Sequence, residues 1–278
     1  MFDVKVSLIA SAVRIPLWSK FLESLHGTSV EYEVIFAGDA SLDAVDRFIY
    51  DSCSRVFKYQ ITKHIKPAQC YEIARRMAVG ECIVWVADDC EFPNNVIGKA
   101  YDYWKSKEDS KLILSIQTKE SGYKLPVGQL FDMSIHRFLA GVPSTPLMAP
   151  LGMMNRIFLE YLGGLDRRYV CGQYENDIVM RAHEHGGKVE VFGNKDTYID
   201  IDHLGKSLLI GESKTESDFL NRPFAKGYKQ DRLILERSWA THKMFPVFNV
   251  SSTQLDKFEP YEDKDILEKS QSNKGIWD

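Results

Sequence analysis

Residues 84–91, VWVADDCE, decide the fold, because a strongly apolar run ends there in the adjacent carboxylates Asp88 and Asp89. The run itself (residues 81–87, ECIVWVA) is the most apolar of the chain and predicts a strand buried in a sheet. Two carboxylates at the end of such a strand must meet cations, hydrogen-bond donors or water, since their burial without partners is costly. A simple turn, or a cap for a helix starting near Pro93, is the structural alternative to a site.

Outward from this strand, short apolar runs alternate with helical patterns. We expect further strands at residues 5–10, 32–37, 55–60, 111–117, 188–192 and 197–201. We expect helices at residues 16–25, 41–50, 67–79, 93–107, 156–162 and 176–185. The alternation predicts an α/β fold with a Rossmann-like, mixed, mainly parallel sheet flanked by helices. Ligands of such sheets bind beyond the carboxyl ends of the strands, where the acidic pair lies.

The 278 residues suit one large domain with an appendage. Residues 1–210 hold the alternating pattern and form the predicted catalytic domain. Residues 211–278 form a predicted C-terminal extension, helical at 215–239 and polar at its end. Residues 122–150 are rich in glycine and proline and show little periodicity, which is typical of a binding loop.

Composition narrows the class of protein. The net charge of -4 gives no sign of a basic face, so a nucleic-acid partner is not favoured. Five cysteines without a C-x-x-C pair favour reduced thiols and a cytoplasmic location. The first apolar run is too short for a signal peptide, and no run has the roughly 18 apolar residues of a membrane span. We expect the arginine doublets to be solvated charges, with a phosphate clamp as the alternative: Arg75, Arg76, Arg167 and Arg168.

The acidic pair also has a specific chemical use. Mg²⁺ and Mn²⁺ prefer oxygen ligands and are often held by one or two carboxylates together with substrate phosphates. A nucleoside diphosphate is a substrate of that kind, because a divalent ion neutralises it as a leaving group.

Six short motifs occur in a fixed order along about the first 205 residues. They are residues 6–9 (VSLI), 38–41 (GDAS), 78–81 (AVGE), 87–89 (ADD), 163–166 (GGLD) and 174–177 (YEND). Each motif alone is modest, but the ordered set resembles the family 2 glycosyltransferases, which have the GT-A fold. The resemblance implies an enzyme that transfers a sugar from a nucleotide donor.

The resemblance also implies a donor site. Asp39 would contact the nucleoside base, with Ser11 and Ala12 lining the same pocket. Asp88 would lie near the ribose or the diphosphate, and Asp89 would be the principal metal carboxylate, for Mn²⁺ or Mg²⁺. The chain departs from the family's D-x-D motif at its first acidic position, which is Ala87 here.

A second acidic motif supplies the expected catalytic group. Transfer with inversion needs a general base that takes the proton of the acceptor hydroxyl. By resemblance this base is Glu175, and Asp177 is the second candidate. A charged first turn that interacts with the helix dipole is the structural alternative for either residue.

The end of the last predicted strand matches a further family position. His203 would complete the metal site and supply the ligand that Ala87 does not, whereas a packed or surface histidine is the alternative. Lys206 and Ser207 would contact the diphosphate of the donor.

The sequence thus predicts an inverting, metal-dependent hexosyl- or pentosyltransferase. A UDP-sugar is the expected donor, and the acceptor is a glycan, a lipid-linked sugar or another molecule with a hydroxyl group. A nucleotidyltransferase is the nearest alternative, but residues 11–14 (SAVR) lack the glycine-rich loop that it usually has after the first strand. A non-catalytic module that binds a nucleotide or a sugar is the alternative from another class.

Overall fold

The computed structural model describes residues 3–52, 56–62, 66–120, 130–131, 147–166, 168–194, 196–201, 206, 209–211, 214, 231 and 234–235. Its helices are α1 (Ile15–Leu25), α2 (Leu42–Ser52), α3 (Pro67–Met77), the 3-10 helix η1 (Pro93–Asn95), α4 (Val96–Ser106), α5 (Arg156–Tyr161) and α6 (Tyr174–Glu184). Its strands are β1 (Val6–Ser11), β2 (Tyr32–Gly38), β3 (Phe57–Ile61), β4 (Cys82–Trp85), β5 (Cys90–Glu91), β6 (Leu112–Ile116), β7 (Thr118–Glu120), β8 (Leu130–Phe131), β9 (Gly152–Asn155), β10 (Lys188–Phe192) and β11 (Ile199–Ile201).

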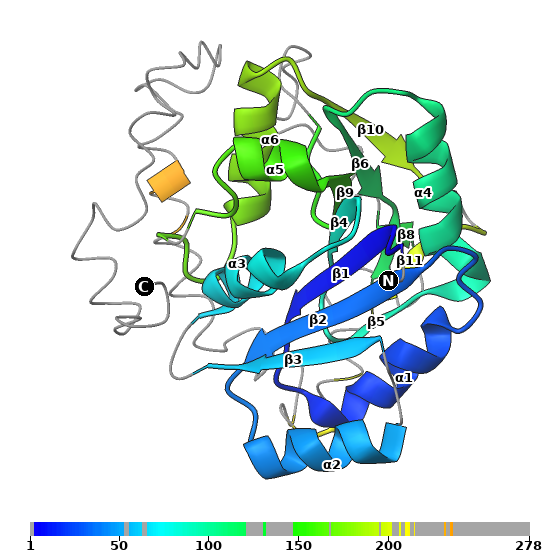
Figure 1. The fold of residues 1–278 in the computed structure, drawn as a ribbon, viewed down its shortest axis with the longest axis vertical. Helices are drawn as coiled ribbons and strands as arrows, with labels where there is room; N and C mark the ends of the chain where they lie inside the picture. Colours follow the sequence, from blue (N-terminus) through cyan, green and yellow to red (C-terminus); the bar gives the residue numbers. More distant parts are fainter. Residues whose placement is uncertain are drawn as a thin grey trace.

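The main sheet has seven strands in the order β10-β6-β9-β4-β1-β2-β3 (Figure 1). Strands β1, β2, β3 and β4 pair in parallel, as do β10 and β6. Strand β9 is antiparallel to both of its neighbours, β4 and β6. The predicted mixed, mainly parallel sheet is therefore confirmed, and the carboxyl ends of β1, β2 and β4 lie at one edge.

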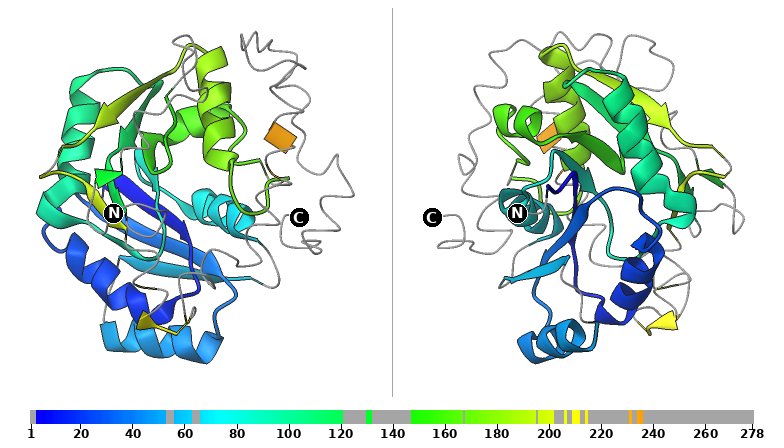
Figure 2. Two further views of the ribbon diagram at one scale, coloured as in Figure 1. Left: turned by 180° about the vertical axis from the view of Figure 1, so that it is seen from behind. Right: turned by 45° about the vertical axis from the view of Figure 1, so that its right-hand side comes forward.

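Helices cover both faces of this sheet. Figures 1 and 2 show α3, α5 and α6 on one side and α1 and α4 on the other. Helix α1 has Pro16 in its first turn, where the missing N–H costs nothing. Its buried residues recur at helical spacing, and Trp18 packs edge-on against Phe36 with ring centroids 5.4 Å apart.

The central strands of the sheet are buried from solvent. All four residues of β4 are buried, and so are the first five residues of β1. Strands covered on both faces carry continuous apolar runs, which is why β4 is so conspicuous in the sequence. A rigid, buried β4 fixes the position of the acidic residues that follow it.

A second sheet of four strands, in the order β5-β11-β7-β8, was not predicted. Strand β5 directly follows the acidic pair, and its Glu91 lies opposite Asp200 of β11. These strands have two or three residues each, so they carry too few positions for an alternating pattern. The small sheet brings the end of β11 to the acidic motif.

Most predicted elements are confirmed with shifts of one to three residues at their ends. The prediction missed β9, because its residues GMMN include neither a β-branched nor an aromatic side chain. Most of residues 122–150 and of the predicted helix at 215–239 lie outside the described residues. Within the part of the chain that the structure describes, no helix has the length and apolar character to cross a membrane.

Candidate active site

The acidic motif lies three residues beyond the end of β4, and both carboxylates are 1% exposed. Oδ2 of Asp88 accepts hydrogen bonds from the backbone N–H groups of Val13 and Arg14, each 2.9 Å long. The indole N–H of Trp18 lies 3.4 Å from the same oxygen. Asp88 therefore fixes the turn that follows β1 and joins the carboxyl ends of two neighbouring strands.

Arg14 neutralises the acidic pair, a role that was not predicted from the sequence. Its Nε donates to Oδ1 of Asp88 at 2.7 Å, and its Nη1 donates to Oδ2 of Asp89 at 2.8 Å. Its Nη2 forms an ion pair with Asp88 as well. The signal was present, since Arg14 is the first basic residue after the first strand, three positions beyond its end at the ligand-binding edge.

Lys206 brings a second cation to the motif from a position 117 residues away in the chain. Its Nζ donates to the backbone carbonyl of Asp89 at 2.5 Å and forms a 2.9 Å ion pair with Glu91. The predicted donor-binding residue Lys206 thus lies beside the acidic motif. Ser207 and His203, its predicted partners in the site, lie outside the described residues.

The residues around Asp89 fit a divalent ion in part. Asp89 offers hard carboxylate oxygens, and one carboxylate with substrate phosphates is a common way to hold Mg²⁺. Across the described ranges, however, no group of three His, Cys, Asp or Glu side chains is arranged to hold a metal. Nη1 of Arg14 already donates to Oδ2 of Asp89, so an ion at that oxygen would have to take the place of the guanidinium.

The residues predicted to bind the nucleoside base, Ser11, Ala12 and Asp39, lie at the ends of β1 and β2. Asp39 is exposed directly after β2, whereas Ala12 has no exposed surface. The hydroxyl of Tyr59 donates to the carbonyl of Ala12 at 3.1 Å and accepts from the N–H of Ala40 at 3.0 Å. Ser11 hydrogen-bonds the buried thiol of Cys70, whose pKa is raised by burial to about 11. Of these three predicted residues, Asp39 is therefore the most exposed.

Glu175 lies in the first turn of α6, after Gln173, which has a left-handed φ of 67°. Its Oε2 is buried and has no hydrogen-bond partner among the described residues. Burial raises the pKa of Glu175 to about 7, and the nearby carboxylates of Asp231 and Asp177 add to the rise. A carboxylate with this pKa is suited to accept a proton near neutral pH.

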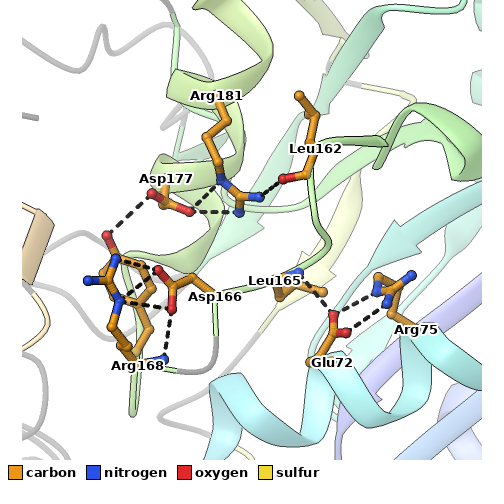
Figure 3. A network of polar contacts seen from close by, with 9 residues as sticks. Glu72, Arg75, Leu162, Leu165, Asp166, Arg168, Asp177 and Arg181 are labelled. Atoms are coloured by element: carbon orange, nitrogen blue, oxygen red, sulfur yellow. Dashed lines mark hydrogen bonds and ion pairs between the residues drawn. The ribbon is translucent and has the colours of Figure 1, made fainter. Parts of the chain in front are cut away.

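Asp177 is fully buried and differs from Glu175 in its surroundings. Its Oδ2 accepts from Arg181 Nε at 2.8 Å and pairs with Nη2 at 2.7 Å, and Tyr169 donates to Oδ1 at 3.5 Å (Figure 3). Arg181 in turn donates to the carbonyl of Leu162 at 2.5 Å. Asp177 therefore orients Arg181, which ties α6 to the end of α5, and this is a structural arrangement.

Two of the arginines expected to be solvated are ion-pair partners with little exposure. Arg75 pairs with Glu72, whose Oε2 also accepts from the backbone N–H of Leu165 at 2.9 Å (Figure 3). Arg168 pairs with Asp166 at 2.7 Å. The expectation was wrong for Arg75 because the turn at 163–166 folds onto α3, a contact that local sequence does not reveal. It was wrong for Arg168 because this side chain pairs locally with the buried Asp166.

Comparisons with known proteins support the fold. No family model and no curated protein matches the chain. Among solved structures, S. aureus TarS 1–349 in complex with UDP-GlcNAc aligns with a TM-score of 0.58 at 14% identity, over 92% of this chain and 78% of TarS 1–349. GalNAc-T7 with UDP, GalNAc and Mn²⁺ aligns with a TM-score of 0.54 at 13% identity, over 72% of this chain and 44% of GalNAc-T7. The chain has the GT-A fold expected from the sequence, and identities this low show the fold alone.

Proposed function

We propose that this protein is a glycosyltransferase that uses a nucleoside-diphosphate sugar as donor. The observation that carries the proposal is the carboxylate of the half-buried Glu175, whose Oε2 is buried without a hydrogen-bond partner among the described residues, in a GT-A fold with an acidic pair after β4. Burial also raises the pKa of this carboxyl to about 7. A transferase needs both a proton acceptor and a charged site for the leaving diphosphate. The GT-A neighbours TarS and GalNAc-T7, solved with UDP-GlcNAc and UDP, make UDP the proposed nucleotide.

In the proposed reaction, Glu175 takes the proton of an acceptor hydroxyl. The oxygen forms a bond to the anomeric carbon on the face opposite the donor phosphate. The bond from that carbon to the phosphate oxygen breaks, and its electron pair leaves with the diphosphate. This path inverts the anomeric configuration, and the acceptor is a glycan, a lipid-linked sugar or another hydroxyl-bearing molecule.

The acidic motif and the residues around it, together with Asp39, would bind the donor. Asp39 would contact the base and Asp88 would hold the turn after β1, against which the ribose lies. Arg14 and Lys206 would place positive charge beside the phosphates. A divalent ion, when bound by Asp89 and the predicted ligand His203, would supply further charge for the departing diphosphate.

We also propose a cytoplasmic location for the enzyme. Cys70, Cys82, Cys90 and Cys171 are free thiols, and three of them are buried. Free thiols are typical of a reducing compartment.

Donor binding tests the first part of the proposal. UDP, GDP, CDP and TDP are added to the protein with and without Mn²⁺, and the unfolding temperature is measured. We expect UDP to raise it most, because a ligand at 100 times its Kd stabilises the folded state by about 2.7 kcal/mol. Equal, negligible shifts for all four nucleotides would contradict a donor site.

Turnover tests the second part. UDP release from UDP-GlcNAc is measured for the wild type, Asp89→Ala, Glu175→Gln and the control Asp102→Asn, which changes an exposed residue of α4. We expect Glu175→Gln to bind UDP normally and to lose about 100-fold in kcat, the usual scale of a general base. Asp89→Ala is expected to abolish the stimulation by Mn²⁺. Turnover by Glu175→Gln at the rate of the control would move the base elsewhere.

A further inference from the structure

The loop at residues 170–172 joins the turn at 163–166 to α6, and one distant side chain binds its backbone. Asp231 accepts the N–H of Val170 at 2.8 Å through Oδ1, and the N–H groups of Cys171 and Gly172 at 2.6 and 2.8 Å through Oδ2. Its side chain is fully buried, and its backbone is helical. Three charge-assisted bonds to consecutive N–H groups hold a loop far more tightly than one would.

This loop determines where α6 begins. The carbonyl of Val170 accepts from the N–H of Ala68 at 3.2 Å, so the first turn of α3 holds the loop from the other side. The next residue, Gln173, has the left-handed conformation that turns the chain into the helix, and its carbonyl accepts from the N–H of Asp177 at 2.9 Å. Glu175 therefore follows the anchored residue Gly172 by three positions.

We infer that Asp231 is a positioning residue for sugar transfer, which holds the loop at 170–172 so that the carboxylate of Glu175 meets the acceptor hydroxyl. The inference rests on the proposed role of Glu175 as the base. Asp231 is not expected to touch the substrate and acts through the backbone of the loop. An anchoring group matters there, because displacing a catalytic group by about 1 Å can cost 100-fold in rate.

The charge of Asp231 also affects the pKa of Glu175. Burial raises the pKa of Asp231 to about 6, while its three backbone N–H bonds favour the ionised form. Once ionised, Asp231 adds to the burial that raises the pKa of Glu175. Among the described residues, the other charged or titratable groups around this pair include Asp177, Asp166, Tyr174, Cys171 and, beside Cys171, Lys66.

Two substitutions in the full chain separate the positional effect from the charge effect. Asp231→Asn keeps the size of the side chain but removes its charge and one acceptor oxygen. Asp231→Glu keeps the charge but lengthens the arm, so that the carboxylate no longer fits all three N–H groups. The measurements are kcat for UDP release from UDP-GlcNAc across pH 5–9, the Kd of UDP, and the unfolding temperature, with Asp102→Asn as the matched control.

We expect both variants to lose about 10- to 100-fold in kcat, with the Kd of UDP unchanged. Only Asp231→Asn should move the acid limb of the pH profile to lower pH, since removing a neighbouring negative charge lowers the pKa of Glu175. General damage would instead reduce the rate at every pH and weaken UDP binding in proportion.

Wild-type kcat in a folded Asp231→Asn protein would overturn the inference. If Asp231→Asn fails to fold, Asp231→Glu decides alone, and an unchanged kcat there has the same meaning. The proposed function is tested separately by Glu175→Gln. An active Glu175→Gln variant refutes the base, whereas an inactive one beside fully active Asp231 variants refutes only the positioning role.

Discussion

At the scale of single residues, the raised pKa of the proposed base Glu175 also affects the stability of the fold. Burial raises its pKa from 4.5 to about 7 in the folded protein. A raised pKa means that the folded state binds the proton more tightly than the unfolded state. This stabilising contribution is complete below pH 4.5 and is lost as the pH rises through 7.

Glu175→Gln should therefore stabilise the fold at high pH. Glutamine resembles the protonated carboxyl, so we expect little change at pH 5 and a gain of up to about 3 kcal/mol at pH 8, at 1.36 kcal/mol per pKa unit. Urea unfolding at both pH values measures it, with the exposed Glu23→Gln of α1 as control. Equal stability differences at pH 5 and pH 8 would contradict the raised pKa.

Arg14 is the other residue on which the site depends. Without it, Asp88 and Asp89 are buried with less positive charge around them, and breaking a buried ion pair typically costs about 3 kcal/mol. We expect Arg14→Gln to be destabilised by that order of magnitude, and Mn²⁺ to stabilise this variant more than the wild type. Thermal unfolding with and without MnCl₂ measures both effects.

The control for Arg14 is Lys20→Gln, which changes an exposed residue of α1. It should unfold like the wild type and respond to Mn²⁺ as the wild type does. A stable Arg14→Gln protein without any Mn²⁺ effect would show that neither the guanidinium nor a metal neutralises the acidic pair.

At the scale of elements, the ends of β1 and β2 approach each other very closely. A Cβ at Gly38 would lie 2.1 Å from the carbonyl oxygen of Ala12, so only glycine fits there. Gly38→Ala should push the two strand ends apart and destabilise the fold by about 1–3 kcal/mol, as overpacking does. It should also weaken UDP binding, because Asp39 follows directly.

The comparison for this change is Gly27→Ala. No atom lies within 4 Å of a Cβ built at Gly27, so this alanine should leave stability unchanged or slightly improved. Denaturant unfolding and the Kd of UDP are measured for both variants. Matching values for the two would mean that the strand ends relax at no cost.

Elements with a strong local pattern were predictable, and those that depend on distant partners were not. The apolar run of β4 predicts a buried strand, and the spacing of Leu17, Phe21 and Leu25 predicts the helix α1. The pairing of Glu72 with Leu165, or of Asp231 with the loop at 170–172, joins residues 59 to 93 positions apart. Single-sequence reasoning placed the two acidic motifs but had no means to find these contacts.

At the scale of the whole molecule, residues beyond 210 contribute to the core of the GT-A fold. Ile234 and Leu235 are 5% and 3% exposed and belong to the main hydrophobic core, and they follow Asp231 by three and four positions in the chain. The predicted boundary after residue 210 remains a prediction, and these contacts argue that residues 1–210 depend on the C-terminal residues for part of their core.

A chain truncated after residue 210 should accordingly be unstable. It loses two buried aliphatic side chains, worth about 1.5–3 kcal/mol each, together with the bonds of Asp231. We expect a lower unfolding temperature and loss of UDP release, whereas truncation after residue 240 retains all three residues and serves as control. Full activity of the shorter chain would establish residues 1–210 as a complete catalytic domain.

The register between β5 and β11 sets the position of the residues that follow β11 relative to the acidic motif. Because Asp200 is held opposite Glu91, the number of residues after β11 decides which side chain arrives at the carbonyl of Asp89. One residue deleted between 193 and 198, if the strand slipped to compensate, would move everything downstream by about 3.3 Å and turn its side chains over. Related chains that tolerate long insertions elsewhere should keep the length of the connection between β10 and β11, residues 193–198, constant.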